Sequence, residues 1–289
     1  MARRWIWPSP PTRNASAVSD APASNSLSVR TRITTAIPLI GGFLAALYLA
    51  PTGVWIGLTG LVLLLAAREW AGMAGLGRPH AFLYAGLLSL ASLGVAVAAP
   101  DRVEPYYPAL AFWLLAPILL ARGVAIRSRA MHLLLGAIVL IPTHLAMVKL
   151  RGESPDLLLV VVGIVIIADS AAYFSGRRFG RHKLAPAISP GKTWEGAIGA
   201  GLAVTLYGLV VHFATPDTCG LACLPRVLAA FWVLFVLSVL GDLFESALKR
   251  QAGIKDSGNL LPGHGGILDR IDSLSAVLPI ATLLWIWLK

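Results

Sequence analysis

Charged residues are scarce in this sequence. Asp, Glu, Lys and Arg together make up 13% of the 289 residues, whereas apolar residues make up 57%. A soluble domain carries about 25% charged residues, so the low share excludes that class. The apolar residues stand in long runs, which indicates an integral membrane protein. In a membrane protein, the basic residues behind the net charge of +10 orient the loops and attract anionic lipid. We therefore expect no nucleic-acid partner.

Motifs typical of covalent and zinc catalysis are also missing. The sequence contains no HExxH motif and no recognisable Ser-His-Asp set. Its only two cysteines, Cys219 and Cys223, lie in the segment CGLAC without the further ligands that a zinc site needs. A local disulfide and two small apolar side chains are both compatible with this spacing.

Nine apolar runs follow a polar N-terminal segment. A helix that spans a membrane needs roughly 20 apolar residues, and no run shows the alternation of a strand. We therefore predict an all-α, polytopic membrane helix bundle with about nine transmembrane helices, although three of the runs are short. The runs lie at residues 33–50, 53–67, 81–99, 107–121, 131–149, 156–176, 194–214, 227–247 and 273–288.

The basic residues predict how these helices are oriented. If the N-terminus is cytoplasmic and every run crosses the membrane, 19 of the 24 Lys and Arg residues lie in cytoplasmic segments, as the positive-inside rule requires. We expect a disordered cytoplasmic tail at 1–30, because this segment is rich in Ser, Ala, Pro and Asn. N-terminal transmembrane helices are expected at 31–150 and a C-terminal transmembrane catalytic region at 151–289.

Carboxylates inside two apolar runs mark the first candidate site. Asp169 interrupts the run at 156–176, and Asp242 and Glu245 lie near the end of the run at 227–247. An acid in a spanning helix costs about 2.5–3.5 kcal/mol and usually faces a partner, a cavity or an ion. At helical spacing Asp169 and Tyr173 share one face of their helix. On the later helix, Asp242 shares a face with Glu245, Ser246 and Lys249. The alternatives are boundary charges that reach water and, for Asp169, a buried pair with an arginine.

A loop at 175–196 carries the second polar cluster, with five cations between two apolar runs. Its end, SPGKTWEG, contains Gly-Lys-Thr, but the upstream glycine of a P-loop would fall at Pro186 and no predicted strand precedes it. A lysine, a hydroxyl and free amide groups at a helix start still suit phosphate oxygens. The substrate-binding candidates here are Ser189, Lys192, Thr193 and Glu195, whereas Arg177, Arg178 and Arg181 are equally well explained as charges that set the topology.

The third polar cluster is the stretch KDSGNLLPGHGGILDRID at 255–272. Pro-Gly-His-Gly-Gly predicts a tight turn, in which Gly265 and Gly266 let a ligand approach the backbone. His264 is a candidate general base, phosphate donor or turn-stabilising donor. For Asp256, a solvated or N-capping charge is the simpler interpretation.

Carboxylates of this stretch complete a candidate metal site. Asp269 and Asp272 lie one helical turn apart, and with Asp242 and Glu245 they suit a hard cation such as Mg²⁺, which also binds phosphates. Phosphate donors and metal ligands without a protein nucleophile are typical of phosphoryl or nucleotidyl transfer. A site embedded in the membrane further indicates one lipid substrate and one water-soluble, cytoplasmic substrate.

The C-terminal motifs resemble the signature of the phosphatidate cytidylyltransferase (CDP-diacylglycerol synthase) family. The pattern is Ser246-Ala-Leu-Lys-Arg, then Lys255-Asp256 after four residues, then LLPGHGGILDRID. The segments DSAAYFSGRRFGRHKLAPAISPGKTWEG and GDLFES are similar to the same family, so the resemblance covers about residues 165–275. It implies that CTP and phosphatidic acid give CDP-diacylglycerol and pyrophosphate. It also implies Mg²⁺ with an assisting monovalent cation such as K⁺, a homodimer and a nine-helix bundle. The distribution of basic residues places the active site on the cytoplasmic side, and we expect a bacterial-type inner membrane.

Hypotheses for individual residues follow from the resemblance and the spacing. The metal ligands would be Asp242 and Asp269, with Glu245 and Asp272 as further candidates. The catalytic candidates, whose cations would neutralise phosphates, are Asp242, Asp269, Lys249, Arg250, Lys255, Asp256, His264 and Arg270. The substrate-binding candidates are Asp169, Tyr173, Ser189, Lys192, Thr193, Glu195, Ser246, Gly265 and Gly266.

Two other functions share part of this pattern. A CTP-dependent lipid kinase, such as a polyprenol kinase, would use the same metal and nucleotide but would release CDP. A non-enzymatic, ion-coupled transporter would use intramembrane acids. The transporter predicts internal repeats and acids at mid-membrane depth, and the sequence shows neither.

Overall fold

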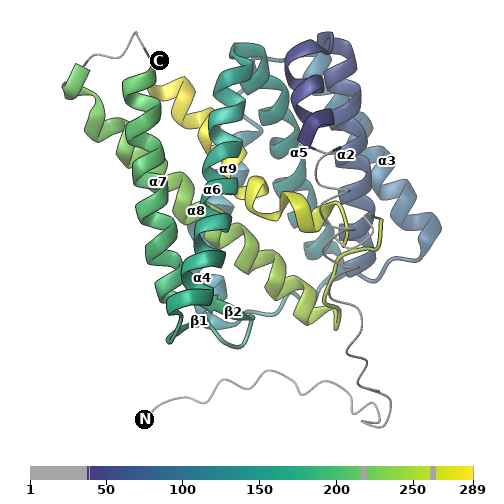
Figure 1. Cartoon of the computed structure of the whole chain (residues 1–289). Helices are drawn as coiled ribbons and strands as arrows, with labels where there is room; N and C mark the ends of the chain where they lie inside the picture. The colour runs from purple at the N-terminus through teal and green to yellow at the C-terminus, as the bar shows by residue number, and fades with distance from the viewer. Residues whose placement is uncertain (1–37, 39, 216–219, 261–264, 289) are drawn as a thin grey trace.

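Helices form most of the chain in the computed structural model, which describes residues 38, 40–215, 220–260 and 265–288 (Figure 1). The tail predicted at 1–30 lies outside the described residues, as does Cys219 of the predicted cysteine pair. Each of the nine predicted apolar runs overlaps a described helix. The helices are Ile40–Leu49, α2 (Thr52–Met73), α3 (Arg78–Ala98), α4 (Tyr106–Arg122), α5 (Arg129–Glu153), α6 (Pro155–Phe179), α7 (Trp194–Ala214), α8 (Leu224–Gln251) and α9 (Leu268–Leu288), with a 3₁₀ turn η1 (Gly220–Ala222) before α8.

Seven of these helices are long and apolar enough to cross a membrane, namely α2, α3 and α5 to α9. Helix Ile40–Leu49 and α4 are apolar but shorter. Large side chains such as Leu87, Leu202 and Phe213 point outward with 61%, 68% and 68% of their surface exposed, as expected of helices that face lipid. The chain is therefore a polytopic membrane helix bundle, while the count of nine spans and the cytoplasmic N-terminus stay predictions.

Helix ends follow from the local sequence. The Ser154 side chain accepts a hydrogen bond from Asp156 N at the start of α6, and Pro155 fills the first helical position, where no N–H is needed. Thr193 caps α7 in the same way through Gly196 N. Gly123 ends α4 in the left-handed conformation, which glycine adopts without a steric penalty.

Helix α9 connects the two sides of the bundle. It packs against α8, α5, α4 and α6, while α6 packs on α7 and α2 packs on α3. Figure 1 shows α6, α7 and α8 grouped apart from α2, α3 and α5, with α9 between the groups. The polar residues at the start of α9 therefore lie where both groups meet.

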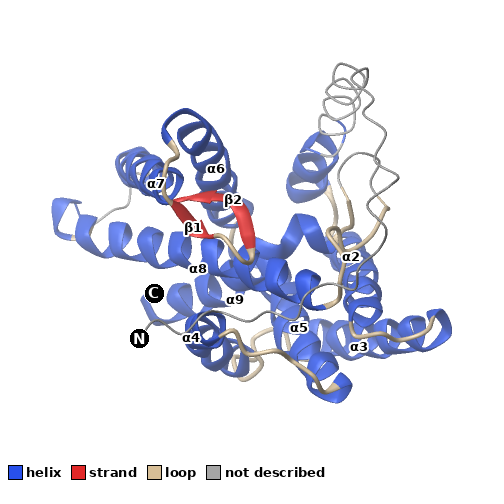
Figure 2. Cartoon of the chain, turned by 90° about the horizontal axis from the view of Figure 1, so that it is seen from below, coloured by secondary structure: helices blue, strands red, loops and turns tan. Residues whose placement is uncertain are grey.

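The loop between α6 and α7 contains a hairpin that the all-α prediction missed (Figure 2). Strand β1 (Lys183–Ala185) pairs antiparallel with β2 (Ser189–Thr193), with Lys183 opposite Thr193 and Ala185 opposite Ser189. Two prolines, Pro186 and Pro190, prevent a continuous helix in this loop. Strands of three and five residues are too short to show a clear alternation, which explains why the sequence pattern did not predict them.

Candidate active site

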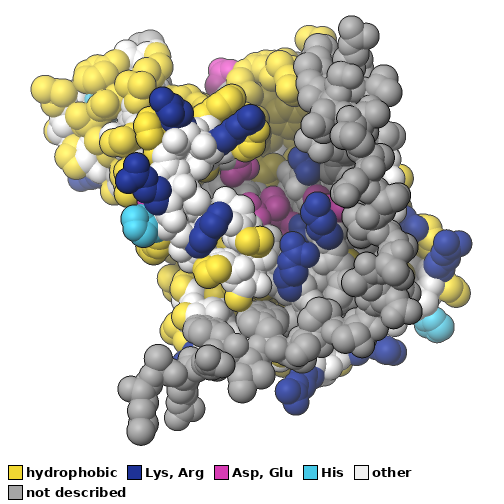
Figure 3. Space-filling view, turned by 60° about the horizontal axis from the view of Figure 1, so that its bottom comes forward, with side chains coloured by type: hydrophobic (Ala, Val, Ile, Leu, Met, Phe, Trp, Pro, Cys, Tyr) yellow, Lys and Arg dark blue, Asp and Glu magenta, His cyan; other side chains and the backbone are white. Residues whose placement is uncertain are grey.

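Lysine and carboxylate side chains from distant segments meet at one polar hollow of the molecule. In Figure 3 acidic side chains lie in a depression with Lys and Arg side chains around it. Lys192 of β2 contacts Asp242 of α8, with 2.7 Å between Nζ and Oδ2. Arg250 Nε donates to the carbonyl of Ile188 in the hairpin turn at 3.4 Å. The hairpin is therefore attached to α8 beside the acids.

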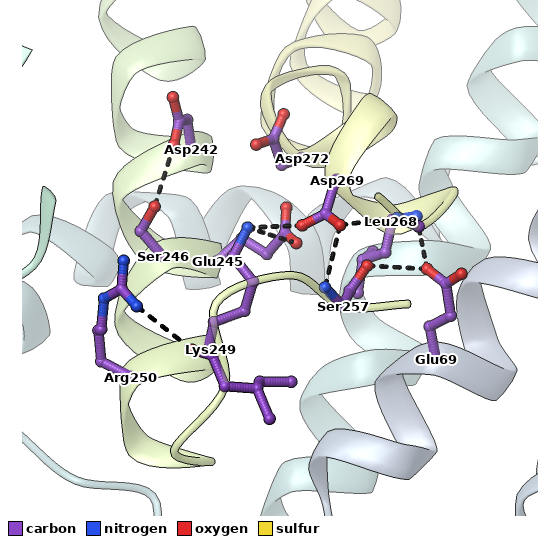
Figure 4. Close-up of polar contacts among 12 residues, drawn as sticks. Glu69, Asp242, Glu245, Ser246, Lys249, Arg250, Ser257, Leu268, Asp269 and Asp272 are labelled. Atoms are coloured by element: carbon purple, nitrogen blue, oxygen red, sulfur yellow. Dashed lines mark hydrogen bonds and ion pairs between the residues drawn. The ribbon is translucent and has the colours of Figure 1, made fainter. Parts of the chain in front are cut away.

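A second lysine joins α8 to α9. Lys249 Nζ lies 2.6 Å from Asp269 Oδ1 and 3.3 Å from Glu245 Oε1 (Figure 4). Asp269 Oδ2 also accepts from the backbone N–H groups of Ser257 and Gly266, at 2.9 and 2.8 Å. Asp269 is thus held by three donors, and both of its oxygens are engaged.

Glu245 is the most deeply buried acid of this group, with 3% of its surface exposed. Among the described residues its carboxylate oxygens have no hydrogen-bond partner, and the contact with Lys249 is an ion pair at 3.3 Å. A buried carboxylate without hydrogen bonds is costly, so such groups usually face a cation or a ligand. Lys249 is the cation that faces Glu245 among the described residues.

Asp169 on α6 and Asp272 on α9 complete the acidic group. Asp169 interacts electrostatically with Asp242, Lys192 and Arg270, and Asp272 interacts with Asp242 and Asp169. In Figure 4 Asp242 and Asp272 extend into the same space from α8 and α9. Acids from three helices therefore share one site.

Other candidates line this site or hold neighbouring segments. Ser246 Oγ donates to Asp242 Oδ1 at 3.2 Å. Tyr173 lies one turn beyond Asp169 on α6, and its hydroxyl accepts from Arg177 Nη1 at 3.0 Å. Glu195 accepts from the backbone N–H of His182 at 3.2 Å, and its Oε1 lies 2.6 Å from His182 Nδ1. The Glu195 carboxylate and the Thr193 hydroxyl, which caps α7, therefore fasten the hairpin to α7 in this structure.

Several of the predicted site residues are solvent-exposed or lie outside the described residues. Lys255, Asp256 and Arg270 are exposed near the turn. Gly265 adopts a φ of 79°, which glycine tolerates, whereas most of the predicted Pro-Gly-His-Gly-Gly turn lies outside the described residues. Gly266 donates its N–H to Asp269. His264 lies outside the described residues, so its predicted role stays a prediction.

The carboxylates suit a magnesium ion by their chemistry. Among the described residues no three Asp, Glu, His or Cys side chains are grouped closely enough to form a complete metal site. Mg²⁺ bound with a nucleotide usually takes one or two protein carboxylates and completes its shell with phosphate oxygens and water. Asp242 and Asp269 carry carboxylate oxygens of this kind, so the chemistry of these two side chains suits the ion.

Glu69 on α2 belongs to the same site, although the sequence reasoning missed it. Its carboxylate accepts from Ser257 Oγ and from the backbone N–H groups of Ile267 and Leu268. The only signal in the sequence is one acid beside Arg68 at the end of an apolar run. Such a position is also typical of a plain boundary charge.

The described residues thus form a membrane helix bundle in which acids and lysines from several helices share one site. A sequence model described as the cytidylyltransferase family matches residues 30–287, so this chain belongs to that family. It is 40% identical over 273 residues to the phosphatidate cytidylyltransferase of Pseudomonas aeruginosa, an alignment that covers 89% of this chain and 97% of the relative. The enzyme of the same name from Haemophilus influenzae is 37% identical over 281 residues, covering 87% and 96%.

Proposed function

We propose that this protein transfers the cytidylyl group of CTP to phosphatidic acid, giving CDP-diacylglycerol and pyrophosphate. The observation that carries the proposal is the site in which Lys192 and Lys249 contact Asp242 and Asp269. The family membership supports the proposal, because the two relatives named above, which align with most of this chain, are phosphatidate cytidylyltransferases. The chemistry needs cations and positioned oxygens but no protein nucleophile.

The lipid phosphate is the nucleophile in this mechanism. One of its oxygens attacks the α-phosphorus of CTP, a new P–O bond forms, and the bond from the α-phosphorus to the bridging oxygen breaks, so that pyrophosphate leaves. Lys192, Lys249 and Arg250 would neutralise the charge of the phosphates during this displacement. Asp242 and Asp269 would hold Mg²⁺, which supplies Lewis-acid polarisation of phosphate oxygens when it is bound.

The surroundings of the reaction form part of the same proposal. The distribution of Lys and Arg supports an active site on the cytoplasmic side of a bacterial-type inner membrane. A homodimer and an assisting monovalent cation such as K⁺ are proposed from the family resemblance.

The purified protein in detergent is expected to convert CTP and phosphatidic acid into CDP-diacylglycerol and pyrophosphate when Mg²⁺ is present. Removing Mg²⁺ with EDTA should stop turnover, because the phosphate charges would lose their main counter-ion. Thin-layer chromatography of the lipid product together with a pyrophosphate assay measures the reaction. Release of CDP with a phosphorylated lipid would instead identify a kinase, and no nucleotide turnover would contradict the proposal.

A further inference from the structure

Glu69 binds the start of α9 from a helix of the N-terminal half. It is 7% exposed and accepts from Ser257 Oγ at 2.8 Å, Ile267 N at 3.1 Å and Leu268 N at 2.9 Å (Figure 4). The first N–H groups of a helix have no partner within the helix, and a carboxylate there is favoured by the helix dipole. Glu69 therefore caps α9 across a distance of about 200 residues in the sequence, 199 to Leu268.

Ser257 links Glu69 to the acid that we place in the metal site. The Ser257 hydroxyl donates to Glu69, whereas its backbone N–H donates to Asp269 at 2.9 Å. Asp269 follows Leu268 directly, so its backbone position also depends on the cap that Glu69 provides. A displacement of Glu69 would therefore move donors that fix the Asp269 carboxylate.

The backbone packs so closely around Glu69 that side chains have no room. A Cβ atom at Gly258 would lie 2.5 Å from Glu69 Oε1, and a Cβ atom at Gly266 would overlap Glu69 Oε2 and Ser257 Oγ. Contacts under about 3 Å between such atoms are not tolerated without a shift of the structure. The backbone at Gly258 and at Gly266 therefore approaches the Glu69 carboxylate too closely for a side chain at either position.

We propose that Glu69 is a positioning residue of the transferase reaction, which orients Asp269 and the adjoining turn without touching the substrates. This inference rests on the proposed function, since it assigns Glu69 a purpose in that reaction. It assigns the N-terminal half a part in forming the active site, where the sequence indicated only apolar helices.

Glu69→Gln tests the proposal because it keeps the size of the side chain but replaces one acceptor oxygen with an NH₂ group, which then faces N–H or O–H donors. We expect kcat to fall roughly 10- to 100-fold, the range seen when a partner of a metal ligand is removed, while KM for both substrates changes less than about threefold. Glu69→Asp keeps the charge on a shorter side chain and should recover part of the loss. The matched control is Glu153→Gln, which alters a glutamate paired with Lys149 away from the site and should leave kcat unchanged.

Hydrogen exchange of the full-length protein in detergent supplies a readout that is independent of activity. In Glu69→Gln, peptides covering 255–272 should exchange faster, while peptides of α7 should match those of the wild type. Wild-type exchange at 255–272, or a wild-type kcat, would overturn the proposal. If the wild type makes no CDP-diacylglycerol, the proposed function fails, and the exchange rates alone decide whether Glu69 holds this segment.

Gly258→Ala tests the same contact if Glu69→Gln does not fold. The added methyl group presses on Glu69 Oε1, so it should lower kcat and speed exchange at 255–272 in the same direction. Gly72→Ala is its control, because a Cβ there meets nothing within 4 Å although it lies on the same helix as Glu69. Equal behaviour of the two alanine variants would contradict the proposal.

Discussion

Replacing Asp269 with asparagine is expected to lower kcat at least about 100-fold, because several kcal/mol of transition-state stabilisation depend on a metal ligand. The Asp269 oxygens accept from Lys249 on one side and from Ser257 and Gly266 N–H on the other. Asparagine has a single acceptor oxygen, so one of these sides must face its NH₂ group. Turnover of CTP and phosphatidic acid over a range of Mg²⁺ concentrations measures the effect.

Asp101→Asn is a suitable control for this change. Asp101 has the same chemistry and is paired with Lys149, but its side chain is 84% exposed and lies in a loop outside the site. It should keep wild-type turnover. If Asp269→Asn is as active as the wild type even at low Mg²⁺, Asp269 is not a metal ligand.

Replacing Lys249 with methionine is expected to remove both activity and stability. Lys249 is 9% exposed, and its loss leaves the carboxylates of Glu245 and Asp269 buried without their counter-ion. Breaking a buried ion pair in this way typically costs about 3–5 kcal/mol. The thermal unfolding midpoint in detergent should therefore fall clearly, and turnover should fall as well.

Lys192→Met is the informative comparison for Lys249→Met. The pair of Lys192 with Asp242 is partly open to solvent, with side-chain exposures of 24% and 28%, so its loss should cost no more than about 1 kcal/mol. Turnover should still fall, because a cation beside the phosphates is lost. Equal unfolding midpoints for the two methionine variants would contradict this account of the site, whereas Lys249→Met combined with Glu245→Gln should regain part of the stability.

The apolar runs predicted the described helices well, because helix length and hydropathy are local properties of a membrane sequence. The hairpin at 183–193 was missed because its strands of three and five residues are too short to show a clear alternation. Local pattern thus predicted the long apolar helices and failed for short elements.

The candidate site was predictable where polar residues interrupt apolar runs. Asp169 and Asp242 stood out for that reason, and Asp269 stood out as part of the polar stretch at 255–272. The structure places Asp169 near Asp242 and joins Asp269 to α8 through Lys249. Glu69 did not stand out, because its significance comes from Ser257 and Leu268, which lie far away in the sequence. A contact between two halves of a bundle has no local signature, so only the folded structure could reveal it.

The fate of the phosphates of CTP tests the central claim most directly. The purified protein is incubated with phosphatidic acid, Mg²⁺ and CTP labelled either at the α-phosphate or at the γ-phosphate. We expect the α-label to enter the lipid and the γ-label to be released as pyrophosphate, because the lipid phosphate attacks the α-phosphorus. Transfer of the γ-label to the lipid, or no label in the lipid from either nucleotide, would contradict it.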